Sequence, residues 1–245
     1  MESTGIILAA LDCDLDVIEE WNRWYDLEHL PPNVALDGVM FGHRYVATPD
    51  LHALRTTSDA SGFSGQRASF LTIYTLSGDP QSVFTGMSDL REELVAAGRM
   101  FPDEKKAVRE GGVFGIRWTA SDPVLKAAVI DVPFLQHTGI VVVQRRQDDQ
   151  LEGWYRTTFA ERAVAVPGVS AVLGYESLTR PGVALEIVLL EGDPAESADR
   201  LTTSVAHHPD AEVAVEAPFS LISPLRYPWA DDLRSSGLPE TVSST

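Results

Sequence analysis

The feature that most constrains this sequence is an internal repeat. Residues 24–45 align without gaps to residues 154–175, and seven of the 22 aligned positions are identical. Average composition would give about one or two identities by chance. A second block, 71–80, matches 185–194 at six of ten positions. The offset falls from 130 to 114, so the first half carries 16 extra residues, and the chain is predicted to contain two copies of one structural unit.

Both halves show the same order of expected elements. In the first half, strands are predicted at 5–11, 39–47, 70–76 and 113–118, with helices from 14 to the Pro31-Pro32 pair and at 81–97. In the second half, strands are predicted at 139–143, 169–175, 184–190 and 219–222, with helices at 150–165 and 194–206. The order βαββαβ predicts a four-stranded antiparallel sheet with both helices on one face. The open apolar face of each sheet needs a cover, which the other half supplies.

This pattern divides the chain into four predicted parts. They are a first repeat at 1–118, a linker at 119–138, a second repeat at 139–226 and a C-terminal tail at 227–245. The tail is rich in Ser, Thr and Pro, and we expect it to be loose or draped over the surface. The extra segment 48–67 is rich in Ser, Gly and Thr, which favours an exposed loop over a lid on the barrel.

The charge balance and the cysteine content exclude several classes of protein. The net charge is −17, from 36 acidic and 19 basic residues, and such a surface repels nucleic acids and anionic membranes. Cys13 is the only cysteine, so an intramolecular disulfide and a thiolate metal cluster are both excluded. No apolar run approaches the length of a membrane span. We therefore expect a cytoplasmic protein that binds neither nucleic acid nor membrane.

One block of the first half resembles a known family. The sequence WYDLEHLP at 24–31, followed by GV at 38–39 and RY at 44–45, resembles the signature of EthD-like proteins. These belong to the dimeric α/β-barrel (ferredoxin-like) superfamily, whose members usually pair two separate chains. The resemblance implies an α+β fold in which two ferredoxin-like repeats of one chain pack sheet to sheet. The superfamily includes cofactor-free monooxygenases, polyketide cyclases, muconolactone isomerases and haem-binding enzymes, so the fold does not fix the function.

The second half keeps the aromatic and glycine positions of this block but changes its polar ones. The pairs are His29/Phe159, Asp26/Arg156, Glu28/Thr158 and Arg44/Gly174. We interpret this difference as one site in the first half, with the second half as scaffold. A separate site in the second half is the alternative.

His29 is the main catalytic candidate. It lies four residues after Tyr25 on one face of the predicted helix, just before the two prolines that are expected to end that helix. A helix C-terminus stabilises the imidazolium form and can raise its pKa, which suits general acid–base chemistry near neutral pH. The alternative is a histidine that caps the last carbonyl groups of the helix.

Two neighbouring strand residues are further candidates. His43 alternates with Phe41 and Tyr45 on one face, and Arg44 points the opposite way, so only one of His43 and Arg44 can line the barrel interior. His43 aligns with an apolar residue in the second half. Arg44 could anchor an oxyanion or a carboxylate, or it could form a salt bridge to Asp26 or Glu28 across the helix end.

Other polar residues have weaker claims. Tyr25 recurs in both halves, which favours packing over a proton relay through its hydroxyl group. Asp26 could orient His29 or make an ordinary surface contact. Glu186 interrupts an apolar run, and a strand edge that reaches water is favoured over a buried carboxylate. His207 and His208 are adjacent, diverge on a helix and do not suit one metal ion.

These residues predict an enzyme without cofactor or metal that acts on a small apolar organic molecule. His29 would transfer a proton, and His43, Arg44 or Tyr25 would hold a developing oxyanion, as in an isomerase, cyclase, lyase or dehydratase. The first alternative is a monooxygenase, or a haem enzyme with His29 as the iron ligand. The second alternative is a binding protein without catalysis. A homodimer of fused pairs is compatible with each of these functions.

Overall fold

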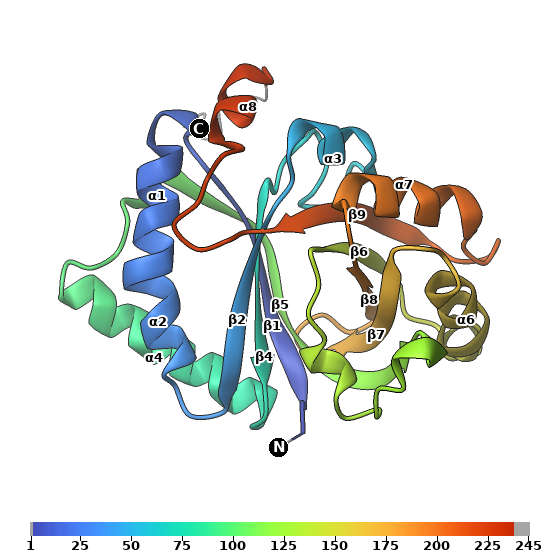
Figure 1. Cartoon of the computed structure of the whole chain (residues 1–245). Helices are drawn as coiled ribbons and strands as arrows, with labels where there is room; N and C mark the ends of the chain where they lie inside the picture. Colours follow the sequence, from blue (N-terminus) through green and yellow to red (C-terminus); the bar gives the residue numbers. More distant parts are fainter. Residues whose placement is uncertain (1, 238–245) are drawn as a thin grey trace.

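The first half forms a four-stranded antiparallel sheet in a computed structural model, which describes residues 2–237 (Figure 1). Its strand order is β2 (Val39–Val46), β4 (Phe70–Leu76), β1 (Gly5–Cys13) and β5 (Lys106–Ser121). The helices α1 (Ile18–Trp24), α2 (Leu30–Val34) and α4 (Pro80–Ala96) lie together on one side of this sheet (Figure 1). Strands β1 and β4 are buried over almost their whole length because helices cover one face and the barrel interior the other.

The second half repeats this arrangement. Its strand order is β7 (Val169–Ser177), β8 (Val183–Leu190), β6 (Gly139–Arg146) and β9 (Val213–Leu221), again antiparallel. Its helices are α5 (Asp149–Trp154), α6 (Ala160–Val164) and α7 (Pro194–Ser204). The predicted order of strands and helices is therefore present in both halves, and the fold class is α+β.

The two sheets join at both edges and close into a barrel. Strand β5 pairs with β7 from Phe114–Ser177 to Ser121–Ala171. Strand β2 pairs with β9 only at Tyr45–Leu221 and Val46–Ser220. One seam of the barrel is thus fully hydrogen-bonded, and the other is paired at one end of β2 alone.

The barrel interior is an apolar core to which both halves contribute. Its buried members include Leu8, Phe114, Ile140, Leu173 and Phe219. Separate clusters fill the space between each sheet and its own helices. Side chains on alternate strand positions therefore meet either the interior or the helices.

The first helix does not end at the two prolines, and that expectation was wrong. A π-helical turn, Tyr25–His29, follows α1, and α2 continues to Val34 with Pro31 in its first turn. The N–H of Leu30 donates to the carbonyl oxygen of Tyr25, five residues earlier. A proline is tolerated there because the widened turn and the new helix start need no N–H at that position.

The extra segment 48–67 is not the exposed loop that its composition favoured. It forms α3 (Pro49–Ala53) and β3 (Thr56–Thr57), and β3 pairs with β9. Leu51 and Phe63 are buried in the interior core. The segment is therefore anchored to the barrel by these apolar side chains and by the pairing of β3 with β9.

The linker and the tail also pack on the barrel. Strand β5 runs to Ser121, past the predicted start of the linker, and two short 3-10 turns follow, Pro123–Leu125 and Val132–Phe134. In the tail, α8 (Ala230–Ser235) packs through Leu233 against the outer core of the first half. Residues 238–245, the rest of the predicted tail, lie outside the described part. Within 2–237, no helix has the length and apolarity that a membrane crossing requires.

Candidate functional site

The candidate residues of the first half divide between two faces of β2. Arg44 points outward, beneath α1, and His43 lies on the inward face together with Tyr45. Tyr25, Asp26 and His29 all belong to the π-helical turn on the outer side. The structure therefore brings Arg44 together with that turn and keeps His43 apart from it.

Arg44 is a buried cation whose partners all come from the helix above it. Its Nη1 lies 2.6 Å from Oδ1 of Asp26, and both side chains are almost fully buried. Its guanidinium also donates to the side-chain and backbone oxygens of Asn22. The Cζ atom lies 4.2 Å from the ring centroid of Tyr25, a cation–π contact. Arg44 therefore forms a salt bridge to Asp26, which was the alternative to binding an oxyanion or a carboxylate of a substrate.

Asp26 connects this cluster to the C-terminal segment. Its second carboxylate oxygen accepts hydrogen bonds from the backbone N–H of Leu225 at 2.8 Å and from the hydroxyl group of Tyr227 at 2.7 Å. It therefore does not orient His29. Tyr25 is fully buried, and burial raises the pKa of its hydroxyl group. The outer cluster is consequently built to hold the helix and the C-terminal segment on the sheet.

His29 lies within a continuous helix rather than at its C-terminus, so the predicted imidazolium stabilisation is wrong. Its ring stacks on Trp24 with centroids 4.9 Å apart and meets the edge of Tyr25 at 4.7 Å. Burial lowers the pKa of His29 to about 4, so the ring is neutral near pH 7. Its Nδ1 atom is buried without a hydrogen-bond partner.

The Nδ1 atom of His29 does not suit the haem alternative. An axial ligand needs a ring nitrogen that faces an open, flat apolar slot. The Nδ1 atom is enclosed by protein, and Trp24 covers one ring face. Nδ1 of His29 therefore does not fit an iron ligand. Among residues 2–237, no group of three or more His, Cys, Asp or Glu side chains has the arrangement of a metal site.

A second cluster lies at the end of the barrel where β6 begins. We call it the His43 cluster: Phe41, His43, Tyr45, Phe134 and His137. The His43 ring lies 4.8 Å from Phe41 and 5.3 Å from His137, centroid to centroid, and Phe41 lies 5.7 Å from Phe134. Tyr45 is buried, and the other four side chains are partly exposed. The cluster thus brings together rings from β2 and from the linker at one end of the barrel.

Two hydrogen bonds fix the protonation of His137. Its Nδ1 lies 3.0 Å from the carbonyl oxygen of Leu135, which can only accept, so Nδ1 carries the proton. Its Nε2 lies 2.8 Å from the hydroxyl oxygen of Tyr45. Burial lowers the pKa of His137 and raises that of Tyr45, so both groups are neutral. The hydroxyl group of Tyr45 therefore donates to Nε2.

His43 differs from His137 because its ring nitrogens form no hydrogen bond to any other residue of the described 2–237 range. Burial, with a smaller contribution from His137, lowers the pKa of His43 to about 4. Its aligned counterpart is Leu173, a member of the interior core. A neutral, unpaired imidazole thus occupies a position where the second half has a hydrocarbon.

Sequence reasoning missed His137. It lies in the segment that was predicted to be a linker, 92 residues from its partner Tyr45. Neither periodicity nor the repeat marks this residue. The only signal was the aromatic character of the linker, at Phe134.

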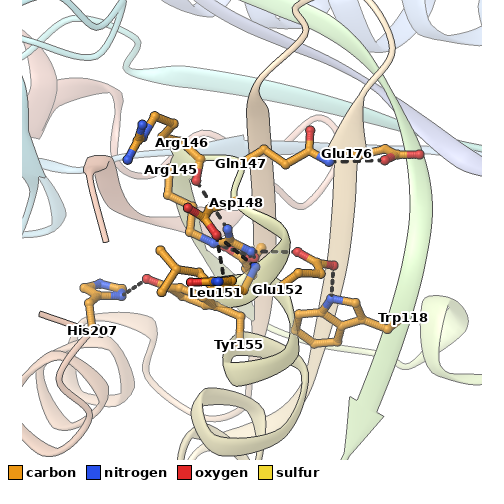
Figure 2. Close-up of polar contacts among 12 residues, drawn as sticks. Trp118, Arg145, Arg146, Gln147, Asp148, Leu151, Glu152, Tyr155, Glu176 and His207 are labelled. Atoms are coloured by element: carbon orange, nitrogen blue, oxygen red, sulfur yellow. Dashed lines mark hydrogen bonds and ion pairs between the residues drawn. The ribbon is translucent and has the colours of Figure 1, made fainter. Parts of the chain in front are cut away.

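The second half has a network of polar contacts of its own. The sequence comparison did not predict this network, because the second half lacks the polar residues that the first half has at the aligned positions. Arg145 lies over the ring of Tyr155, with Cζ 3.9 Å from the centroid, and donates to Glu186 at 2.7 Å and Glu152 at 2.9 Å. Figure 2 shows this guanidinium between the strand and α5, with Trp118 donating to Glu152. Tyr155 aligns with Tyr25, so each half places an arginine on its recurring tyrosine, but from a different strand.

Glu186 is not at an exposed strand edge, as was favoured, but is 1% exposed. Strand β8 is central, between β7 and β6, so the side chain cannot reach water. Burial raises the pKa of Glu186 to about 7, although Arg145 opposes this shift. Beside this pair, the hydroxyl group of Tyr155 lies 3.2 Å from Nδ1 of His207, whose Nε2 lies 3.1 Å from Glu216 (Figure 2 labels the first two). His207 lies beyond the end of α7, not within a helix as predicted.

Sequence comparisons leave the family of this chain open, because no protein-family model and no curated protein matches it significantly. Solved structures are similar in fold. A candidate chlorite dismutase has a TM-score of 0.51 at 9% identity, over 95% of this chain and 100% of that one. A candidate monooxygenase from Lactobacillus acidophilus has a TM-score of 0.41 at 11% identity, over 91% of this chain and 100% of that one. An anthrone oxidase-like protein has a TM-score of 0.46 at 12% identity, over 90% of this chain and 92% of that one.

The first of these similarities defines a class of fold. The chain has the dimeric α/β-barrel fold, with both halves of the barrel supplied by one polypeptide. Only the first of these similarities is strong enough to support this assignment. At 9% identity it concerns the fold alone and carries no reaction.

Proposed function

We propose that this protein is an enzyme that acts on a small, flat, largely apolar molecule by general acid–base chemistry, and that His43 transfers the proton. The observation that carries the proposal is the unpaired imidazole of His43, which is partly exposed among aromatic rings at one end of the barrel. With its pKa lowered to about 4, this group is neutral near pH 7 and can accept a proton without first losing one.

The neighbours of His43 suit such a substrate. Phe41 and Phe134 supply ring faces and edges for a flat molecule. Tyr45 directs its proton at His137, which leaves the lone pairs of its oxygen to accept a hydrogen bond from a substrate hydroxyl or amine group. No carboxylate or guanidinium belongs to the His43 cluster, so the proposed substrate is uncharged.

The other predicted residues take supporting roles in this proposal. Tyr25, Asp26 and Arg44 hold the first helix on the sheet, and His29 packs within it. Isomerisation, cyclisation, elimination and dehydration each need a proton transfer at one carbon or oxygen atom, so each is compatible with one neutral imidazole.

Further parts of the proposal rest on the sequence. They are membership of the EthD-like proteins, an origin by fusion of two repeats bounded at 118 and 139, a cytoplasmic location and a homodimer of fused pairs. The repeated tyrosine and glycine positions and the shared order of elements support the fusion.

A general-base probe tests this proposal directly. 5-Nitrobenzisoxazole is flat, apolar and uncharged; when a base removes its ring C–H proton, the N–O bond breaks and a coloured cyanophenolate forms. We expect saturable turnover by the wild type, and a loss of at least about tenfold in kcat/KM in His43→Leu, because leucine occupies the aligned position and keeps the core apolar. His29→Phe, which copies Phe159 of the second half, serves as the matched control and should stay within about twofold.

Three outcomes would contradict the proposal. Equal turnover by the wild type and His43→Leu would show that His43 is not the base. If His29→Phe lost turnover and His43→Leu did not, the catalytic base would be His29 on the helix. Probe binding without turnover in any variant would favour a binding protein.

A further inference from the structure

A second polar group lies on the inner face of the barrel, far from the His43 cluster. Gln144 pairs directly with Leu185 on β8 and Val215 on β9, and both of these partners belong to the interior core. Directly paired residues of antiparallel strands share a face, so Gln144 also faces inward. It lies near the C-terminal end of β6, whereas His137 precedes the start of that strand.

The Gln144 side chain is 8% exposed, and within residues 2–237 its amide forms no hydrogen bond. A primary amide has two N–H donors and a carbonyl oxygen that accepts twice. The N and O atoms of the amide are not among the fully buried side-chain atoms that lack a partner, so they are open to the cleft that this side chain lines. A ligand in that cleft can therefore pair with both of them.

Gln144 lines a cleft of about 360 Å³ at this end of the barrel. Gly182, opposite Gln147 at the rim, also lines the cleft, and a Cβ atom added there would meet nothing within 4 Å. Val183 and Val213 give the cleft apolar walls. The cleft is thus open at its rim, where a small molecule can enter.

The backbone around the cleft is irregular. Gln144 pairs with Val215 and Arg145 with Val213, so Ala214 is the extra residue of a β-bulge. The N–H of Ser58, from the extra segment, donates to the carbonyl oxygen of Ala214 at 2.8 Å. Bulges occur at barrel rims and beside binding sites, where they redirect strands. The first half's extra segment thus completes a cleft of the second half.

The charges at the cleft cancel. Arg146 and Glu212 form an exposed ion pair at the rim, 3.2 Å apart. Arg145 also borders the cleft, but Glu186 and Glu152 engage its guanidinium. The Gln144 amide therefore offers the cleft a neutral donor and a neutral acceptor side by side.

We propose that this cleft binds a small neutral molecule with a cis-amide edge, such as a lactam or a cyclic imide. The ligand's N–H donates to the Gln144 carbonyl oxygen, and its C=O accepts from the Gln144 amide group, which gives two parallel hydrogen bonds. The carbon ring of such a ligand packs on Val183, which lies on the same face of the sheet as Gln144. This site is separate from the proposed proton-transfer site and does not depend on it.

The test is a titration followed by ¹H–¹⁵N NMR, with 2-pyrrolidinone as the probe. We expect saturable shifts of the Gln144 side-chain amide and of the Gly182 backbone amide. N-Methyl-2-pyrrolidinone, which has the same ring and carbonyl group but no N–H, should bind about tenfold more weakly. Gln144→Met, which keeps the side-chain length without hydrogen bonds, should lose a similar factor while its remaining spectrum stays that of the folded protein.

Several results would overturn the proposal. They are no saturable shift with 2-pyrrolidinone, equal affinity for the N-methylated probe, or undiminished affinity in Gln144→Met. Acetate is the charged comparison, and tighter binding of acetate would contradict a neutral ligand. Arg146→Gln is the matched control at the rim and should bind 2-pyrrolidinone within about threefold of the wild type.

Discussion

The hydroxyl oxygen of Tyr45 lies 2.8 Å from Nε2 of His137, and the two rings are stacked with an interplanar angle of 16°. This contact joins β2 to the segment that enters β6, at the seam where β2 and β9 are otherwise paired only briefly. It fixes the proton on Nδ1 of His137 through the carbonyl oxygen of Leu135. Consequently His137 cannot serve as a free base, and His43 beside it can.

This geometry predicts the tautomers of the two histidines. Long-range ¹H–¹⁵N NMR at pH 7 should show His137 as the Nδ1–H tautomer alone, because a hydrogen bond engages each of its nitrogens. His43 should show a mixture, because neither of its nitrogens has a partner. In Tyr45→Phe, Nε2 of His137 loses its donor. A His137 that is already mixed in the wild type would contradict the assignment.

His43→Leu should make the protein more stable. The imidazole is partly buried and has no hydrogen bond to the described residues, so replacing it with the leucine of the aligned position, which buries more apolar surface, should raise the free energy of unfolding by at most ~1 kcal/mol. Urea denaturation measures this change. The reciprocal control is Leu173→His, which places an imidazole in a closed apolar core and should cost ~2 kcal/mol. If His43→Leu lost stability, His43 would have a structural partner that the present account lacks.

The buried ion pair of the first half predicts an asymmetry between two neighbouring acidic residues. Asp26→Ala leaves the guanidinium of Arg44 buried without its carboxylate, and should lower the free energy of unfolding by ~3–5 kcal/mol. Glu28→Ala removes an exposed pair with Arg99 from the same helical turn, and should cost at most ~1 kcal/mol. Chemical denaturation of both variants checks this contrast, and similar costs for the two would contradict it.

Glu186 predicts a pH dependence of stability in the second half. Its pKa is raised from 4.5 to about 7, so between these values the folded state holds a proton that the unfolded state has released. The contribution of this group is present below pH 4.5 and is lost as the pH rises toward 7. The free energy of unfolding of the wild type, relative to Glu186→Gln, should therefore decline across this window. A rise over the same window would mean that Arg145 holds Glu186 ionised.

The sequence predicted the strands well where alternation and burial are strong. Strand β4 was predicted at 70–76 and lies there, because a fully buried apolar run leaves no ambiguity. Strand β5 was predicted at 113–118 but begins at Lys106, because its first part is polar and partly exposed and is defined only by pairing with β1. The helix across Pro31 was missed because a π-turn is set by tertiary packing and not by local propensity.

The candidate site was predictable only in part. The strand period placed His43 and Arg44 on opposite faces, and the repeat marked His43 as a departure from an apolar position. The contact between the rings of His43 and His137 could not be predicted, because His137 comes from an irregular segment far away in sequence. The same reason hid the pairing of Arg145 with Glu186, which are 41 residues apart on neighbouring strands.

The pH–rate profile of 5-nitrobenzisoxazole turnover tests the central claim most directly. If His43 is the base, kcat/KM should rise with an apparent pKa near 4 and stay level up to pH 8, because the neutral imidazole is present throughout that range. His43→Leu should remove this dependence together with the activity. A rise centred near pH 6.5, the ordinary pKa of a solvated histidine, or an unchanged profile in His43→Leu, would contradict the account.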